Sequence, residues 1–460
     1  MKNFGHDLFL RTLLSSVMMK VKPDAPTIAA LLYVIATSVL LDNLEMVGAD
    51  PTSLEVRYLS FVSRYIGYVP SVGSKSFVAA LISEEELHDL ARKNLDDNDR
   101  LPLSAISILS GQKQLVPLFA GPIAEKDSVA RLLVSYAFEP HLSLPQDTER
   151  LVMESPLPPH LSEAILGALY LGAGNQELAR KAQERLKARA RATFMFSLLV
   201  AGVFAGVFVL GLFSWFYEVR RIRDSEELPP LPAEKSSIFL KVFSFFFASI
   251  LTLSILLGPL LASSMSASHA LLLTYILTGI LGFFFIYFFG RTKPTGFFAT
   301  IGLKDFTSHT LLGGLHYGLK AFAMLWPITF AAAFFWAMIA KGSGVFSNPI
   351  VHLLVKEPDI TPLFFAVVFL APLVEEPIFR GFLYGGLREH MSETKAGIIS
   401  SLIFAAAHMS FQNFLPLVAI GFTFCIAYER SRSLLSSMIA HSLWNLTETL
   451  LLIIIFRQAL

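Results

Sequence analysis

Charged and polar side chains interrupt the apolar C-terminal half of the sequence at three places, and the first carries two adjacent glutamates. Glu375 and Glu376 follow the apolar run 364–374, and Arg380 comes four residues after Glu376. Residues four apart share one face of a helix, so we expect Glu376 and Arg380 to form an ion pair. Glu375 is rotated away from that pair, which makes its carboxylate a candidate for proton transfer. The alternative is a salt bridge at a helix end without a chemical role.

The other two places carry histidines. His408 follows Phe404-Ala-Ala-Ala inside the apolar run 397–409, and His441 lies in the last apolar run with Asn445 four residues later. This spacing puts His441 and Asn445 on one side of a helix, and polar residues in such runs usually face the interior of a bundle. Taken alone, His408 is better explained as a core histidine. His441 and Asn445 alone are at least as well explained as a hydrogen-bonded pair between helices.

The three motifs together are more specific than any one of them. Their order, Glu-Glu-x-x-x-Arg, Phe-x-x-x-His and His-x-x-x-Asn, resembles the signature of the CAAX prenyl protease and bacteriocin-processing family of intramembrane endopeptidases. All three motifs are intact and lie on separate apolar segments. The resemblance covers about residues 235–456 and does not extend to residues 1–193.

The resemblance implies a role for each side chain of the motifs. Glu375 would be the general base that activates water, assisted by His408, because a carboxylate shielded from bulk water can exchange protons near neutral pH. His441 and Asn445 would stabilise the oxyanion that forms on the peptide carbonyl. Glu376 and Arg380 would hold the geometry of the site.

The sequence leaves the use of a metal open. Glu375, His408 and His441 are a plausible ligand set for zinc or another divalent metal, and a metal-free mechanism based on the glutamate is equally compatible. The motif His-Glu-x-x-His is absent, which argues against a zincin-type site. The absence of Gly-x-Gly-Asp argues against a presenilin-like aspartyl protease.

The elements that must position these residues are membrane helices. Apolar residues make up 54% of the chain and charged residues only 16%, against about 25% charged in soluble domains. Several apolar runs reach the roughly 20 residues needed to span a bilayer. They lie at 194–217, 242–262, 270–289, 321–340, 362–374, 397–409, 414–428 and 433–456. We therefore predict an all-α, polytopic transmembrane helix bundle with about eight C-terminal spans and a mostly helical N-terminal domain.

Basic residues in the short loops predict the orientation of the spans. The loops after the first and third spans and before the sixth and last hold most of the Lys and Arg residues, and the alternate loops hold fewer. Basic loops lie preferentially in the cytoplasm, so the segment before residue 194 is expected outside it. The predicted location is the cell (plasma or inner) membrane.

The sequence divides into four predicted regions. Residues 1–41 form an N-terminal segment whose apolar stretch 27–41 is a possible membrane anchor, and residues 42–193 form a helical, extracytoplasmic domain. Residues 194–234 hold a transmembrane helix and a proline-containing linker, and residues 235–460 form the protease-like domain. Within 161–189, two helices joined at 172–175 resemble one tetratricopeptide repeat, although an ordinary helical domain explains them better.

Three classes of function remain after this reading. The first is an intramembrane endopeptidase acting on a membrane-associated peptide or protein. The second is a non-catalytic scaffold or bacteriocin-immunity protein of the same fold, with residues 42–193 available to bind a protein partner. The third, a transporter, is weakest because no inverted repeat is visible. Expected partners are membrane lipid and a peptide substrate, and the net charge of +1 gives no basis for binding nucleic acid. The single cysteine, Cys425, excludes an intrachain disulfide.

Overall fold

The structure is a computed structural model, and every regular element in its described part is helical, which confirms the all-α prediction. It describes residues 84–92, 95, 97–139, 143–223, 236–289, 308–340, 353–354, 357, 359–408, 410 and 413–456. The predicted anchor at 27–41 and the predicted linker at 224–235 lie outside these residues.

The chain forms two compact units. One contains mainly residues 48–204, and the other contains residues 205–345 and 356–450. The boundary falls inside α11 (Gln176–Arg223), so one long helix contributes residues to both units. The four regions that we predicted from the sequence stay predictions.

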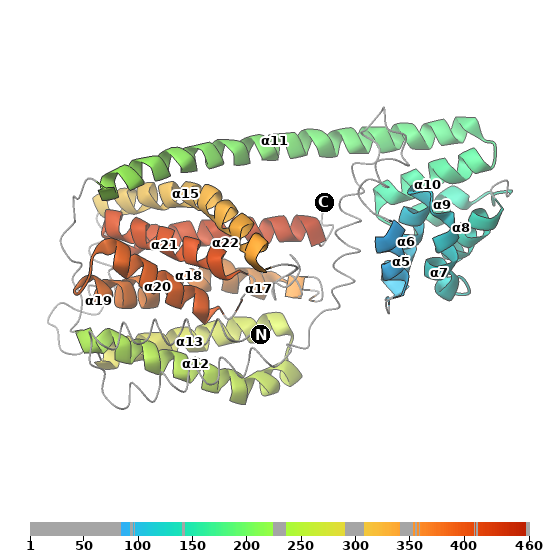
Figure 1. The fold of residues 1–460 in the computed structure, drawn as a ribbon. Helices are drawn as coiled ribbons and strands as arrows, with labels where there is room; N and C mark the ends of the chain where they lie inside the picture. Colours follow the sequence, from blue (N-terminus) through green and yellow to red (C-terminus); the bar gives the residue numbers. More distant parts are fainter. Residues whose placement is uncertain are drawn as a thin grey trace. The chain divides into compact units, whose positions relative to one another are not determined.

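The N-terminal unit is a cluster of short helices around an aliphatic core (Figure 1). Its elements are α5 (Glu84–Ala91), α6 (Asp97–Leu109), η1 (Lys113–Leu115), α7 (Val116–Ala120), η2 (Gly121–Ile123), α8 (Ser128–Phe138), α9 (Thr148–Met153), α10 (Pro159–Gly172) and the start of α11. Asp127 begins α8 by accepting hydrogen bonds from the amides of Val129 and Ala130, which satisfies two donors that a helix start leaves open.

The helix pair that we predicted within 161–189 is present. α10 ends at Gly172 and α11 begins at Gln176, and Gly174 between them adopts the left-handed conformation that such a turn needs, with φ 76°. Arg185 of α11 donates to the buried carboxylate of Glu163 on α10 at 2.9 Å. Because a buried carboxylate needs such a partner, this ion pair fixes the two helices against each other.

The second unit consists of long apolar helices. They are the C-terminal part of α11, α12 (Ser236–Ser264), α13 (Ala267–Phe289), α15 (Ser308–Ala340), the span 361–388, α20 (Glu393–Ala407), α21 (Phe414–Ser431) and α22 (Leu434–Phe456). Among the described residues, six helices are long and apolar enough to cross a membrane: Leu199–Ile222, Ala267–Phe289, Leu311–Trp336, Thr361–Arg388, Phe414–Ser431 and Leu434–Ile454.

Six candidate spans are fewer than the eight apolar runs that we counted, and α12 and α20 account for the difference. α20 has 15 residues and is about 22 Å long at 1.5 Å per residue, which is too short for a hydrocarbon core of about 30 Å. α12 has 29 residues in all, and Lys241–Leu253 is its apolar stretch among the residues described in full. In Figure 1, α20 lies beside α18 and α21, and α12 lies beside α13 at the edge of the bundle.

The span 361–388 is irregular, and it carries the Glu-Glu-x-x-x-Arg motif. α17 (Thr361–Phe365) leads into the π-helical η3 (Ala366–Leu370), α18 (Ala371–Glu376), the π-helical η4 (Pro377–Tyr384) and α19 (Gly385–Arg388). Pro372 and Pro377 remove two backbone donors from the α-helical ladder. π-helical turns are rare and frequently occur at functional sites.

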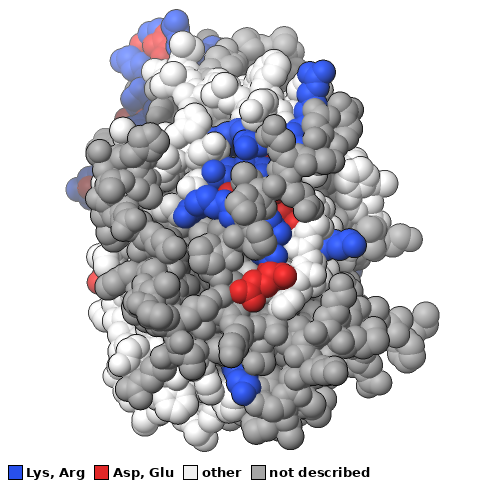
Figure 2. Space-filling view, turned by 90° about the vertical axis from the view of Figure 1, so that its left-hand side faces the viewer, with Lys and Arg blue, Asp and Glu red and all other residues white. Residues whose placement is uncertain are grey.

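The basic segments from three different loops lie at one end of the bundle. The Arg388 guanidinium bonds to Glu429, and Arg430 bonds to Glu218 near the end of α11. Figure 2 views the molecule from the end at which α11 terminates, and Lys and Arg side chains gather there around a few acidic ones. The loop before α13 belongs to the other end, because the Ala267 amide donates to Glu357. This arrangement agrees with the predicted alternation of basic and less basic loops, and which end faces the cytoplasm stays a prediction.

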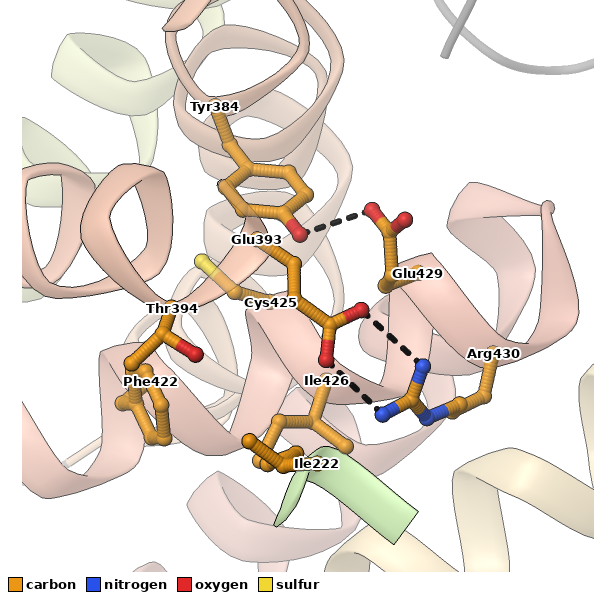
Figure 3. A pocket seen from close by; sticks show the side chains of 9 residues that line it. All are labelled: Ile222, Tyr384, Glu393, Thr394, Phe422, Cys425, Ile426, Glu429 and Arg430. Atoms are coloured by element: carbon orange, nitrogen blue, oxygen red, sulfur yellow. Dashed lines mark hydrogen bonds and ion pairs between the residues drawn. The ribbon is translucent and has the colours of Figure 1, made fainter. Parts of the chain in front are cut away.

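A buried charge cluster holds the end of α11 in this unit. Glu218 is 1% exposed and accepts from Lys320 on α15 and from Arg430 on α21. Arg430 also bonds to Glu393 at the start of α20, and the pair lines a small pocket with Ile222 of α11 (Figure 3). One carboxylate thus connects three helices that are far apart in the sequence.

Glu218→Gln is expected to lower the stability of the membrane unit by about 3 kcal/mol, since it leaves the buried Arg430 with one acidic partner instead of two. The measurement is the thermal unfolding midpoint of the purified full-length protein in detergent. Glu184→Gln is the matched control, because Glu184 lies on the same helix and its pair with Arg180 is exposed to solvent. Equal midpoints for both variants would contradict this role of Glu218.

Candidate active site

Two of the three motifs meet at the carboxylate of Glu376. Arg380 Nη1 donates to Glu376 Oε1 at 3.0 Å, and His441 Nδ1 lies 2.8 Å from the same oxygen. Glu376 is 0% exposed, Arg380 1% and His441 5%. The span 361–388 and α22 are therefore joined by a buried, charge-assisted contact inside the bundle.

Aromatic rings enclose the Arg380 guanidinium. Its central carbon lies 4.4 Å from the ring centre of Phe404 on α20 and 4.9 Å from that of Phe424 on α21. Arg380 Nη2 also donates to the backbone carbonyl of Gly421. A larger residue would be crowded there, because a Cβ atom at position 421 would lie 3.1 Å from the Ser401 backbone. Cation–π contacts of this kind stabilise a buried guanidinium.

The hydrogen bond to Glu376 fixes the role of each His441 nitrogen. An ionised carboxylate accepts hydrogen bonds only, so Nδ1 of His441 carries a hydrogen and donates it. The ring is also stacked on Phe424, with the centroids 4.9 Å apart. Its orientation is therefore held from two sides, and Nε2 is the nitrogen left for chemistry.

Asn445 lies one turn after His441, and its side-chain amide nitrogen uses one of its two hydrogens. Nδ2 donates one hydrogen to the backbone carbonyl of Val367 at 2.8 Å. Val367 belongs to the π-helical η3 of the span 361–388, so the irregular backbone there receives a side-chain partner from α22. The second hydrogen on Nδ2 can donate to another acceptor.

His408 caps the C-terminal end of α20 and is exposed. Its Nδ1 lies 2.8 Å from the Phe404 carbonyl oxygen. A carbonyl only accepts, so Nδ1 donates and Nε2 of the neutral ring carries a lone pair. The His408 and Phe404 rings are 4.5 Å apart, and Phe404 also contacts Arg380 and His441. Phe404 thus links the second motif to the other two.

Glu375 differs from its neighbour Glu376 in its surroundings. It is partly exposed, and its Oε2 atom is buried without a hydrogen-bond partner among the described residues. Arg380 pairs with Glu376 and not with Glu375, which is the division expected from the helical spacing. Neither Glu375 nor His408 forms a hydrogen bond or ion pair with the Glu376 cluster in the described part of the chain.

Several residues of this site were missed in the sequence. Ser437 is fully buried one turn before His441 and could have been found, because it lies four residues before His441 on the same helix face. Phe424 and Gly421 carry no local signal. Their positions matter only once α21 packs against α20 and the span 361–388.

The predicted metal ligands are not gathered around one point. Among the described residues, no three His, Cys, Asp or Glu side chains are placed to hold one ion together. Glu375, His408 and His441 as placed here therefore do not fit a shared zinc ion, which normally needs three protein ligands or more. We derive no chemical step through a metal, and a metal at this site stays a prediction.

Comparison with known proteins finds a family model that matches this region. Residues 357–447 match the family model for type II CAAX prenyl endopeptidase Rce1-like proteins. The protein named "Putative membrane peptidase YdiL" of Bacillus subtilis is 30% identical over 134 residues, which cover 27% of this chain and 54% of YdiL. An uncharacterized 24.3 kDa protein of Escherichia coli is 35% identical over 89 residues, covering 18% of this chain and 41% of that protein.

The aligned segments span about half or less of these curated relatives. No solved structure matches the chain. The family match and the six candidate spans identify an integral, multi-pass membrane protein and support a membrane peptidase in general. The predicted resemblance is thereby confirmed: residues 357–447, which contain all three motifs, match the family model for Rce1-like type II CAAX prenyl endopeptidases.

Proposed function

We propose that this protein is an intramembrane endopeptidase that hydrolyses a peptide bond of a membrane-associated peptide or protein. The observation that carries the proposal is the meeting of the three motifs around Phe404, where Arg380, His408 and His441 all contact one ring. Such a concentration of ionisable groups inside a helix bundle is costly unless it serves a function.

In the proposed mechanism, Glu375 is the general base. It removes a proton from a water molecule, whose oxygen attacks the peptide carbonyl carbon, and the proton then passes to the nitrogen of the leaving amine as the C–N bond breaks. The partnerless Oε2 of Glu375 suits this task, because it has an open acceptor position. His408 assists through the lone pair on Nε2, which can orient the same water.

The oxyanion that forms on the carbonyl needs donors that are already in place. Asn445 supplies its second Nδ2 hydrogen, and His441 supplies Nε2 when the ring is protonated beside the Glu376 carboxylate. Groups fixed in advance cost little reorganisation when charge develops, and one such donor contributes about 3 kcal/mol to lowering the barrier. Glu376 and Arg380 act indirectly by holding His441.

The proposed substrate enters from the membrane. Glu375, His441 and Asn445 all lie on helices long and apolar enough to span it, so the scissile bond must approach them within or next to the bilayer. Since the family match is to CAAX prenyl endopeptidases, suitable probes are a peptide with a prenylated cysteine three residues from its end and an unmodified single-span peptide.

Cleavage of these two probes by the full-length protein in liposomes tests the proposal. We expect the wild type to cleave at least one probe and His408→Ala to lose about a hundredfold in kcat, the lower range for a general acid–base group. His408 is exposed, so its replacement should leave the unfolding midpoint unchanged. His390→Ala is the control, because His390 is an exposed histidine after α19.

Equal rates for His408→Ala and His390→Ala would remove His408 from the mechanism. If the folded wild type cleaves neither probe and protects cells from a bacteriocin, the immunity function is the better reading. If the folded wild type cleaves neither probe and only binds a partner through residues 42–193, the scaffold function is the better interpretation.

A further inference from the structure

α22 carries a carboxylate on the face that holds His441 and Asn445. Glu448 follows His441 by seven residues and Asn445 by three, and seven residues make about two turns of an α-helix. Glu448 therefore lies on the same side of α22 as the two motif residues. The opposite side faces outward at this level, since Leu450, nine residues after His441, is 45% exposed. Glu448 itself is partly buried.

The position of Glu448 within the helix makes its charge informative. It lies inside Leu434–Ile454, a segment long and apolar enough to cross a membrane. An ionisable side chain in such a segment is costly, and these residues usually face the bundle interior and mark the path of a substrate or a proton. The mechanism proposed above gives Glu448 no role.

The span that carries the two adjacent glutamates defines the level of Glu448 in the bundle. His441 bonds to Glu376 in that span, and Asn445 bonds to Val367, nine residues earlier. The span and α22 therefore run in opposite directions. Beyond Asn445, α22 passes the beginning of the span, and Glu448 is one turn farther on the same face.

α20 runs in the same direction as α22. Its first residue, Glu393, bonds to Arg430, which precedes the start of α22 by four residues. Both helices therefore begin at the same end of the bundle. Farther along, the ring of Phe404 on α20 lies 6.3 Å from the ring of His441 on α22.

This register places Glu448 next to the proposed position of the scissile bond. His408 and Asn445 lie at about the same level, because each follows one of these two rings by four residues. In the proposed mechanism, the peptide carbonyl lies between them. Glu448 is about 4.5 Å farther along α22 than Asn445, and an extended peptide advances about 3.3 Å per residue. The carboxylate is therefore within reach of a side chain one or two residues from the scissile bond.

We propose that Glu448 is a specificity-determining residue, whose carboxylate binds a lysine or arginine side chain next to the scissile bond of the substrate. This inference rests on the proposed function and names a substrate class for it. An ionised carboxylate only accepts hydrogen bonds, so it suits an ammonium or guanidinium donor and repels an acidic side chain. Glu448 lies just past the matched residues 357–447 and outside all three motifs.

Altered versions of the probe that the wild type cleaves test the inference. Each residue within two of the scissile bond is replaced in turn by lysine, methionine or glutamate, and any prenylated cysteine is kept. At one of these positions we expect lysine to raise kcat/KM over methionine by about ten- to a hundredfold, the factor that a hydrogen bond to a charged group contributes. Glutamate at that position should lower it.

Two variants of Glu448 reveal whether this side chain reads the charge. Glu448→Gln should lose the preference for lysine, while its rate on the methionine version stays near that of the wild type. Glu448→Lys should prefer glutamate at the same position. Glu389→Gln is the matched control, an identical change to the first variant at an exposed glutamate past the end of the span, and it should keep the preference for lysine.

The outcomes separate this inference from the proposed function. A wild type that cleaves without preferring lysine overturns the specificity role alone. A folded Glu448→Gln variant that keeps the preference also overturns it, and this variant decides even where Glu448→Lys does not fold. If the folded wild type cleaves neither probe, the proposed function fails and the inference fails with it.

Discussion

Glu375→Gln is expected to abolish proteolysis while the protein stays folded. The amide has nearly the shape of the carboxylate but cannot accept a proton from water, so the attacking hydroxide does not form. General bases contribute about a hundredfold to ten-thousandfold to the rate, and we expect a loss of kcat in that range. Because Glu375 is partly exposed and forms no ion pair in the described part of the chain, its neutralisation should leave the unfolding midpoint close to that of the wild type.

The measurement is cleavage of the same two probes in liposomes, with product formation followed by mass spectrometry. Glu389→Gln is the control, since Glu389 lies past the end of this span at an exposed position. Activity of Glu375→Gln within a factor of about two of the control would show that another group removes the proton. In that case His408, whose Nε2 has an open acceptor position, becomes the candidate base.

The sequence was most informative where the contacts are local. The pairing of Glu376 with Arg380 follows from helical spacing, and so does the shared face of His441 and Asn445. The turn between α10 and α11 also follows from local signals, because Gly174 tolerates a positive φ. In each case a few neighbouring residues determine the geometry.

Contacts between helices that are distant in the sequence could not be predicted from local sequence patterns. His441 bonds to Glu376 across 65 positions, and Glu218 bonds to Arg430 across 212. Neither contact has a pattern in the sequence, because it depends on how complete helices pack. Phe424 is an ordinary apolar residue of a span until packing places it on His441.

Among the described residues, fewer helices qualify as spans than there are apolar runs, for a related reason. The apolar run 397–409 reads like part of a membrane span, yet α20 is short and begins only after Ser392. Its neighbours α21 and the span 361–388 supply the apolar surroundings that would otherwise come from lipid. Apolar composition alone does not distinguish a helix that faces lipid from one enclosed in the bundle.

Glu376→Gln, the same substitution one residue later, is expected to have the opposite consequence and to impair folding. It leaves the buried Arg380 guanidinium without its counter-charge, and removing one partner of a buried pair costs about 3–5 kcal/mol. His441 also loses its carboxylate acceptor. We therefore expect a lower unfolding midpoint in detergent and a lower yield of folded protein, in contrast to Glu375→Gln.

The double variant Glu376→Gln/Arg380→Met separates charge from packing. It removes both charges and keeps a long apolar side chain between Phe404 and Phe424. If the cost comes from an uncompensated charge, the double variant is more stable than Glu376→Gln alone, and the thermal midpoints give the coupling between the two positions. Equal stability of wild type and Glu376→Gln would mean that the pair is not buried as the structure shows. Activity need not return with stability, because His441 would still lack the carboxylate that orients its ring.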